Sequence, residues 1–338
     1  MRMKLAEGQL GDRAGDPDIP TLAAVLDPAE LAKELSVVSF PQWQWDASQE
    51  IRLRVLRWRK ASRCTLEIAL STSSGPQELI GKVYAEDRSD VYRTMEQIRK
   101  AGFDSEDEFA IPRPVAFLAS MRLLLYEKVS GIQAKDFMLS PKESDRLLAG
   151  ERCARWLARF HATGPRVGPV VHLSDHLMTL EGYERRLADL GRPFGDKARR
   201  LFEQLATTAS SLGSIETCAG HGMYGPTQVL LAEGRTVTID WDGYDVTDPT
   251  RDVARFIVAL QRLALKYRGS LQALEETADG FLMTYVAAGR ADVSRRLHVH
   301  RAAICLERAH HDVERQTRGW RERAEAMLDD GLRVLEAA

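Results

Sequence analysis

Residues 227–241 are predicted to form a β-hairpin whose strands end in metal-binding side chains. Two short apolar runs flank Glu233-Gly234, a dipeptide typical of a tight turn. Such a turn brings Gln228, at the start of the first strand, almost opposite Asp240, at the end of the second. If the strand continues, Asp242 emerges on the same face as Asp240. Amide and carboxylate oxygens are the ligands that Mg²⁺ prefers, so these three residues form a predicted cation site.

Asp240 differs from the acids that follow it. It comes directly after the apolar run Val237-Thr238-Ile239, where a buried carboxylate costs several kcal/mol unless a cation or a hydrogen-bond donor compensates it. The other acids have an ordinary alternative. Asp242 and Asp245 are then solvated loop residues, and Asp248 and Asp252 are helix caps. The pattern leaves both interpretations open for these four.

The first part of the chain is predicted to form a small β-rich lobe. Five segments alternate in polarity or run apolar, as strands do: residues 51–55, 64–70, 78–84, 111–119 and 121–129. A helix over about residues 90–100 ends before Gly102, which suits a helix C-terminus. Asp27 and Pro28 indicate a short helix over residues 28–35. One lysine, Lys82, lies among the apolar residues of the third strand.

Beyond Gly131 the apolar periodicity is mostly helical. Helical patterns cover about residues 144–161, 177–190, 196–212, 252–288 (with a break) and 299 to the C-terminus. The predicted organisation is therefore α+β: an N-terminal arm with a short helix (residues 1–45), a five-stranded antiparallel lobe with one helix (46–129) and a larger, mainly helical lobe (130–338).

Composition excludes several classes of function for this 338-residue chain. Its 47 basic and 49 acidic side chains give a net charge of -2, too little positive charge for a nucleic-acid-binding protein. Four cysteines lie far apart without a C-x-x-C pair, so neither a disulfide framework nor a structural zinc is expected. No window approaches the roughly 18 apolar residues of a membrane span. We expect a cytoplasmic protein without a membrane partner.

Several segments together resemble the aminoglycoside phosphotransferase and choline kinase-like family, which has a bilobal, protein kinase-like fold. That family carries H-G-D-x-x-x-x-N, then I-D-W/F-E/D, then D-P-x-x-D-L-A. The corresponding segments here are residues 221–228 (HGMYGPTQ), 239–242 (IDWD) and 248–254 (DPTRDVA). Residues 81–84 (GKVY), 123–129 (LLLYEKV) and 156–161 (WLARFH) are similar to further segments of the family, in the same order.

The resemblance implies specific roles for these residues. Lys82 would meet the phosphates of ATP or GTP, with Glu96 on the next helix as its ion-pair partner. The backbone of Glu127 to Val129 would receive the adenine edge. Gln228 and Asp240 would hold Mg²⁺, and His221 would hydrogen-bond the backbone of the loop. A surface lysine with its amine in solvent is the alternative for Lys82.

The sequence departs from the family at Met223, which stands where the family has its catalytic aspartate. A thioether has no useful basicity, so a general-base contribution of about 10² to 10⁴-fold should be missing. Gly225 also replaces a position that often carries His. Two functions follow: a kinase that phosphorylates a small hydroxyl-bearing molecule weakly or not at all, and a pseudokinase that binds a nucleotide or metabolite and regulates a protein partner. An active, atypical small-molecule kinase is a further alternative, so enzyme status is left open.

Two other segments, one rich in basic residues and one rich in histidine, could bind ligands or could be ordinary protein surface. Residues 57–63 (RWRKASR) stand where the family has a Gly-rich loop, and their basic side chains would either meet phosphates or form a solvated hairpin tip. His298, His300, His310 and His311 gather near the C-terminus. His300 and His311 are three helical turns apart, so we expect an exposed helix surface rather than a metal site.

Overall fold

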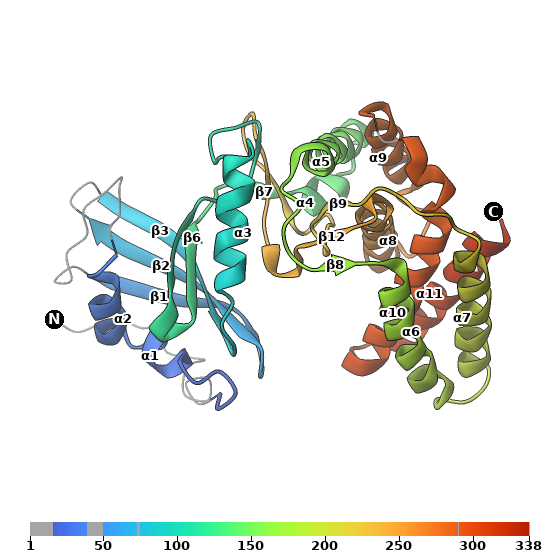
Figure 1. Cartoon of the computed structure of the whole chain (residues 1–338), viewed down its shortest axis with the longest axis horizontal. Helices are drawn as coiled ribbons and strands as arrows, with labels where there is room; N and C mark the ends of the chain where they lie inside the picture. The colour runs from blue at the N-terminus through green and yellow to red at the C-terminus, as the bar shows by residue number, and fades with distance from the viewer. Residues whose placement is uncertain (1–15, 39–49, 73–74, 290, 338) are drawn as a thin grey trace. The chain divides into compact units, whose positions relative to one another are not determined.

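The structure is a computed structural model that describes residues 16–38, 50–72, 75–289 and 291–337 (Figure 1). Residues 1–15 and 39–45 of the predicted N-terminal arm, and residues 46–49 of the predicted lobe that follows it, lie outside the described residues. The chain divides into two compact units, Met1–Ser130 and Gly131–Ala338. Each unit is described by itself.

Unit 1 contains one five-stranded antiparallel sheet, as the sequence predicted. The strands follow the order β1-β2-β3-β6-β5. Their bounds are Ile51–Arg59 (β1), Arg63–Thr72 (β2), Gly75–Tyr84 (β3), Pro114–Leu118 (β5) and Leu123–Glu127 (β6). Alternate residues of β2 are buried, from Cys64 to Leu70. This period of two is the reason that the sheet could be read from the sequence.

Helices cover the sheet of unit 1 through apolar side chains. α1 (Leu22–Leu26) and α2 (Pro28–Leu35) contribute Leu22, Val25 and Leu31 to the core formed by the sheet. Asp27 caps α2 by accepting hydrogen bonds from the backbone N–H groups of the first turn. The remaining elements are α3 (Ser89–Lys100), β4 (Phe109–Ala110) and the 3₁₀ helix η1 (Ala119–Met121). The predicted helices over 28–35 and about 90–100 are confirmed.

A buried aspartate ties the start of the described chain to the turn between β1 and β2. The Asp16 carboxylate accepts hydrogen bonds from Trp58 Nε1 at 3.0 Å and from the backbone N–H of Ala61 at 3.1 Å. Ala61 has a left-handed backbone, with φ 57°, so the turn needs an external partner to hold it. The tip of the basic hairpin is thus braced by an acid from the N-terminal segment.

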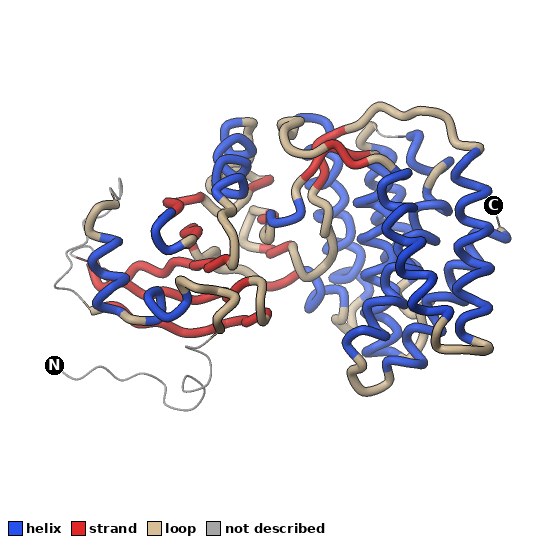
Figure 2. The backbone as a smooth tube through the Cα atoms, turned by 60° about the horizontal axis from the view of Figure 1, so that its bottom comes forward, coloured by secondary structure: helices blue, strands red, loops and turns tan. Residues whose placement is uncertain are grey.

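Unit 2 is mainly helical, with short strands between the helices (Figure 2). Its helices are α4 (Ala134–Met138), α5 (Glu143–Thr163), α6 (Leu173–Ala188), α7 (Phe194–Ser210), α8 (Pro249–Arg268), α9 (Glu275–Ala287), α10 (Leu297–Arg315) and α11 (Trp320–Glu336). Two 3₁₀ helices, η2 (Trp241–Gly243) and η3 (Ala291–Arg295), connect them. Gly269, with φ 79°, ends α8 and makes the break expected in the helical pattern of residues 252–288.

Two small sheets of short strands flank the predicted site residues of unit 2. β9 (Cys218–Gly220) pairs antiparallel with β12 (Asp245–Thr247), which pairs in parallel with β8 (Val170–Val171). β10 (Val229–Leu231) pairs antiparallel with both β11 (Thr236–Thr238) and β7 (Ile132–Gln133). The predicted hairpin around Glu233-Gly234 is therefore confirmed. No helix among the described residues is long and apolar enough to cross a membrane.

The expectation of an exposed histidine surface near the C-terminus is wrong. His300 and His310 are each about 1% exposed, because α10 packs against α6, α7, α8 and α11. Several charged residues of α10 are buried with it. Glu307 forms a bidentate ion pair with Arg255 of α8, with nitrogen–oxygen distances of 2.9 and 2.8 Å. Burial of these groups is tolerated because each is paired.

We predict that Asp16→Ala lowers the free energy of unfolding by about 1–2 kcal/mol, because Trp58 Nε1 and Ala61 N lose their acceptor. Urea unfolding measures the change. Asp18→Ala is the matched control: this exposed aspartate should change stability by no more than about 0.5 kcal/mol. Equal effects of the two substitutions would contradict the bracing role of Asp16.

Candidate functional site

The candidate site of unit 2 centres on the loop of residues 221–228, which follows β9. Gly222 has a left-handed backbone with φ 75°, and a Cβ atom there would lie 2.1 Å from the carbonyl oxygen of Gly243. Only glycine fits this approach of two backbones. The loop therefore lies directly against the 3₁₀ helix η2, which follows Asp240.

A fully buried carboxylate, that of Asp252 on α8, anchors the start of the loop. Its Oδ2 accepts from the backbone N–H of His221 at 2.6 Å, and its Oδ1 accepts from that of Gly222 at 3.0 Å. His161 Nε2 lies 3.5 Å from Oδ2. Burial acts to raise the pKa of Asp252, but the contact with His161 and the charge of Arg251 outweigh it and hold this pKa well below 3.8.

Asp252 is the main residue whose role the sequence reasoning missed. The sequence pattern predicts a helix cap or a member of the acid cluster, whereas the Asp252 carboxylate accepts hydrogen bonds from the backbone of the loop. The available signal was its position four residues after Asp248 in the segment D-P-T-R-D. Asp248 is the residue that caps α8, accepting from the backbone N–H of Thr250 at 2.8 Å.

His221 uses both ring nitrogens to hold the backbone of the loop, as expected. Its Nε2 lies 3.0 Å from the carbonyl oxygen of Ile239, and its Nδ1 lies 3.3 Å from the backbone nitrogen of Met223. This network assigns the proton to Nε2, which donates to Ile239, and leaves Nδ1 as the acceptor. His221 thus fixes the position of Met223 and connects the loop to the end of β11.

Aromatic rings of α5 pack against the loop and against η2. Trp156 of α5 stacks on Tyr224 at 5.8 Å between ring centroids, and Phe160 lies 5.2 Å from Trp241. The Tyr224 hydroxyl donates to the carbonyl oxygen of Cys153 at 2.8 Å. These rings are almost fully buried, so α5 positions the loop through ring packing together with this one hydrogen bond.

The two predicted metal ligands of the hairpin are adjacent in register, but they are not opposite one another. The carbonyl oxygen of Gln228 accepts from the backbone N–H of Ile239 at 2.8 Å, so Ile239 is the residue opposite Gln228. This offset of one residue agrees with the expectation that Gln228 lies almost opposite Asp240. The Gln228 side-chain oxygen accepts from the Thr227 hydroxyl at 2.9 Å.

The second strand does not continue through Asp240. Asp240 has a left-handed backbone, with φ 71° and ψ 61°, and the chain turns directly into η2. The expectation that Asp240 and Asp242 share the face of one strand is therefore wrong. A non-glycine residue in this conformation costs about 1–3 kcal/mol, and such strain gathers at functional sites. The kink gives Asp240 a direction that a regular strand would not.

Asp245 is not the solvated loop acid that the alternative interpretation expected. It is 6% exposed and forms an ion pair with Arg251 at 2.6 Å. Burial raises the pKa of its carboxyl despite this partner. Because Asp245 pairs with Gly220 across β12 and β9, the ion pair braces the strand that leads into the loop.

In unit 1, Lys82 lies on β3, where it is 5% exposed. The alternative of a surface lysine is therefore wrong. Glu96 of α3 forms its ion pair with Arg99, at 3.4 Å between Oε1 and Nε, and no pair with Lys82 is found among the described residues. Glu127 ends β6 and pairs with Arg113 at 3.3 Å. Val129, two residues later, is half-buried.

Comparisons with known proteins were made for the whole chain. A model of the phosphotransferase enzyme family (APH) matches residues 77–295. No curated protein matches the sequence. Among solved structures, the chain is similar to a thermostable mutant of aminoglycoside phosphotransferase APH(4)-Ia in its apo form. The identity is 15% and the TM-score 0.61, over 91% of this chain and 97% of that one.

Two further solved structures are similar at the level of the fold. Amicoumacin kinase hAmiN, in complex with AMP-PNP, Ca²⁺ and Ami, has 14% identity and a TM-score of 0.61, with 94% of this chain and 96% of that one covered. A choline/ethanolamine kinase family protein from Mesorhizobium loti has 14% identity and a TM-score of 0.58, with coverage of 91% and 94%. The predicted α+β, kinase-like fold class is confirmed.

We predict that Asp252→Asn lowers the free energy of unfolding by about 2–3 kcal/mol, because an amide NH₂ replaces one acceptor of two backbone N–H groups. The folded pKa of Asp252 is depressed, so its stabilisation is complete above the unfolded value of 3.8 and is lost as pH falls below it. Denaturant unfolding between pH 7 and pH 2 measures both effects.

Asp279→Asn on α9 is the control, since this acid is exposed. It should leave stability at pH 7 within about 0.5 kcal/mol of the unmodified protein. If the difference between the unmodified protein and Asp252→Asn stays constant down to pH 2, the anchoring role of the ionised carboxylate is wrong.

Proposed function

The chain belongs to the phosphotransferase enzyme family, and from that premise we propose that it binds ATP or GTP with Mg²⁺ while transferring phosphoryl groups to a hydroxyl acceptor weakly or not at all. Family membership makes a nucleotide and a hydroxyl-bearing small molecule the expected partners. The residues of this chain decide how much of that chemistry it keeps.

The proposed nucleotide contacts of unit 1 are Lys82, Glu127 and Val129. Lys82 brings a buried positive charge to β3, and a lysine at this family position suits the phosphates of a nucleotide. The backbone of Glu127 to Val129 is proposed to receive the purine edge. Glu96 is proposed to approach Lys82 when a nucleotide binds, which requires it to leave Arg99. Both side chains of the Glu96–Arg99 pair are half-buried, so this rearrangement has a cost that nucleotide binding must offset.

The proposed Mg²⁺ ligands of unit 2 are Gln228, Asp240 and Asp242. Their donor set of one amide and two carboxylates suits a hard cation, so these residues fit the ion that the family uses. The strained backbone of Asp240 supports its assignment as the principal ligand. When bound, Mg²⁺ would neutralise charge on the phosphate oxygens. The residues around it hold the loop in position, through the Asp252 and His221 hydrogen bonds.

Met223 is the observation that carries the proposal of weak or absent transfer. Its backbone is held by His221, and its Cγ would lie 3.1 Å from a Cβ placed on Gly243. The side chain therefore lies against η2, at the position where the family has a proton acceptor. A thioether cannot take the proton of an attacking hydroxyl. Positioning and metal electrostatics remain, but the contribution of a base is lost.

Gly225 favours the second candidate function, a pseudokinase that regulates a protein partner. A Cβ atom at Gly225 would lie 3.3 Å from Ala259 Cβ and 3.3 Å from Gln228 Oε1. Helix α8 therefore packs closely against the loop at Gly225, where there is no side chain. A larger residue at position 225, as is common in the family, would require α8 or the loop to move. Loss of two polar positions in one loop, with its anchors retained, suits binding better than turnover.

We predict that Mg²⁺ and ATP together stabilise the protein, and that Asp240→Asn removes the part of this effect that depends on Mg²⁺. A ligand at a hundred times its Kd adds about 2.7 kcal/mol. Thermal unfolding with ATP or GTP, each with and without Mg²⁺, measures the effect. Glu233→Gln, an exposed acid in the turn of the same hairpin, is the matched control. A full Mg²⁺ response in Asp240→Asn would refute the ligand assignment.

Met223→Asp should cost about 1–3 kcal/mol of stability and yield no turnover, because a carboxylate would replace an apolar side chain that lies against η2, the 3₁₀ helix directly after Asp240. Met223→Leu keeps the apolar volume and should preserve stability and nucleotide binding. Unfolding and coupled ADP-release assays measure these outcomes. Turnover by the unmodified protein at about 1 s⁻¹ or faster would instead favour an active atypical kinase, with Asp242 or a water orienting the acceptor.

A further inference from the structure

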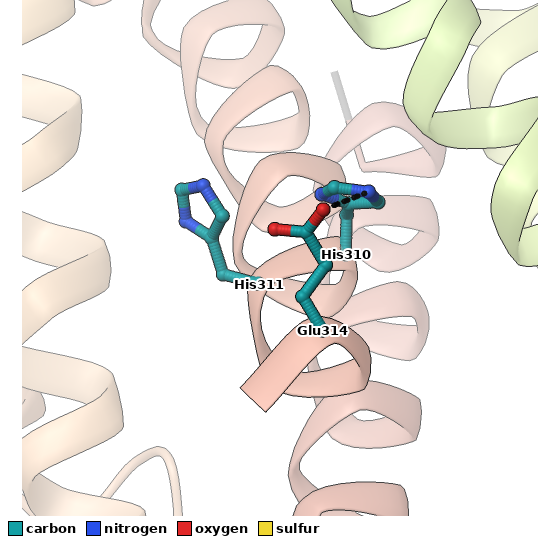
Figure 3. A group of neighbouring side chains, drawn as sticks. All are labelled: His310, His311 and Glu314. Carbon is teal, nitrogen blue, oxygen red and sulfur yellow. Dashed lines mark ion pairs between the residues drawn. The ribbon is translucent and has the colours of Figure 1, made fainter. Parts of the chain in front are cut away.

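Three side chains with metal-binding chemistry meet near the C-terminal end of α10, outside the family segments. His310, His311 and Glu314 each offer one ligand atom, and these atoms lie within 4.8 Å of one another. In the view of Figure 3 the Glu314 carboxylate lies between the two imidazole rings. None of these residues has a role in the proposed nucleotide site, so the inference does not depend on that function.

His310 is buried in an unusual state. It is 1% exposed, and its ring stacks on Tyr183 of α6 at 3.9 Å between centroids and an interplanar angle of 7°. Neither of its ring nitrogens makes a hydrogen bond within the described structure. Nε2 instead lies 3.4 Å from Oε1 of Glu314. Buried polar atoms nearly always have partners, so two orphaned nitrogens call for a ligand.

His311 adds a third buried nitrogen without a hydrogen bond, its Nδ1. The neutral imidazole is the form that binds metal ions. Two imidazoles and one carboxylate are a donor set for borderline ions such as Zn²⁺, rather than for Mg²⁺ or Ca²⁺.

An arginine side chain binds the carboxylate of this cluster. Arg186 of α6 donates from Nη1 to Oε1 of Glu314 at 3.0 Å, and both side chains are largely exposed. Metal–ligand bonds of about 2.0–2.2 Å require the three ligand atoms to approach one another more closely than 4.8 Å. That approach means release of an exposed ion pair, which is worth about 0–1 kcal/mol.

We propose that His310, His311 and Glu314 form a binding site for one Zn²⁺-class transition-metal ion, and that Arg186 competes with this ion for the Glu314 carboxylate. Water completes the coordination on the exposed side. The ion would satisfy the orphaned His310 nitrogen that faces Glu314. Arg308 and Arg315 lie near enough to influence His311 electrostatically, and their charge lowers the affinity for any cation. The four cysteines are buried, so thiols do not compete in the folded protein.

Isothermal titration of the full chain with ZnCl₂ tests the site, and Co²⁺ absorption reports the ligand geometry. The unmodified protein should bind one ion. His310→Phe keeps the stacked ring, loses no hydrogen bond and removes the nitrogens. His310→Phe should weaken Zn²⁺ binding at least about tenfold, since loss of a residue that only hydrogen-bonds a metal ligand already lowers metal affinity about 10- to 100-fold. Glu314→Gln, an exposed change that cannot threaten folding, should weaken binding similarly.

Arg186→Ala should tighten Zn²⁺ binding several-fold, because Glu314 loses its competitor. Arg185→Ala is its matched control on the same helix, since Arg185 pairs with Glu181 instead. His172→Gln removes an exposed histidine elsewhere and should change nothing. The proposal is overturned if the unmodified protein binds no Zn²⁺, if neither His310→Phe nor Glu314→Gln weakens binding, or if His172→Gln abolishes it.

Discussion

The hydrogen bonds from the backbone of His221 and Gly222 to the buried Asp252 carboxylate are the interaction on which the candidate site depends. One side chain accepts from two successive N–H groups, at 2.6 and 3.0 Å, and so fixes the direction in which the loop leaves β9. His221 transmits this position to Met223 and Ile239. A charged acceptor that is fully buried makes both bonds strong and makes its own loss costly. These anchors of the loop use backbone groups and the side chains of Asp252 and His221, and none of them uses the side chain of Met223.

Much of the fold could be predicted from local patterns, since the five strands of unit 1 and the hairpin around Glu233-Gly234 follow from alternation and turn chemistry. The details of the site could not. The backbone turns left-handed at Asp240, where a continuing strand would have placed Asp242 on the same face. The residue types around Asp240 carry no signal for this turn. The burial of His300 and His310 likewise depends on which helices surround α10, a property of tertiary packing.

The residues that anchor the loop differ from the residues that would take part in phosphoryl transfer. Asp252, His221 and the aromatic rings under the loop are in place, as is the buried Lys82 of unit 1. Met223 and Gly225 are the positions at which we propose that polar groups of the family are replaced. Catalysis of phosphoryl transfer needs both binding and a placed acceptor. A chain that keeps the first and loses part of the second can retain its nucleotide as a structural or regulatory ligand.

The central claim, nucleotide binding without ordinary turnover, is tested most directly by ³¹P NMR of ATP and Mg²⁺ mixed with the unmodified protein. The sample should contain a panel of hydroxyl acceptors: an aminoglycoside, a macrolide and choline. We predict that the ATP signals broaden or shift on addition of protein and then persist for hours. Unchanged ATP signals would contradict binding. Conversion of the γ-phosphoryl signal to a phosphomonoester at about 1 s⁻¹ or faster would contradict the loss of transfer.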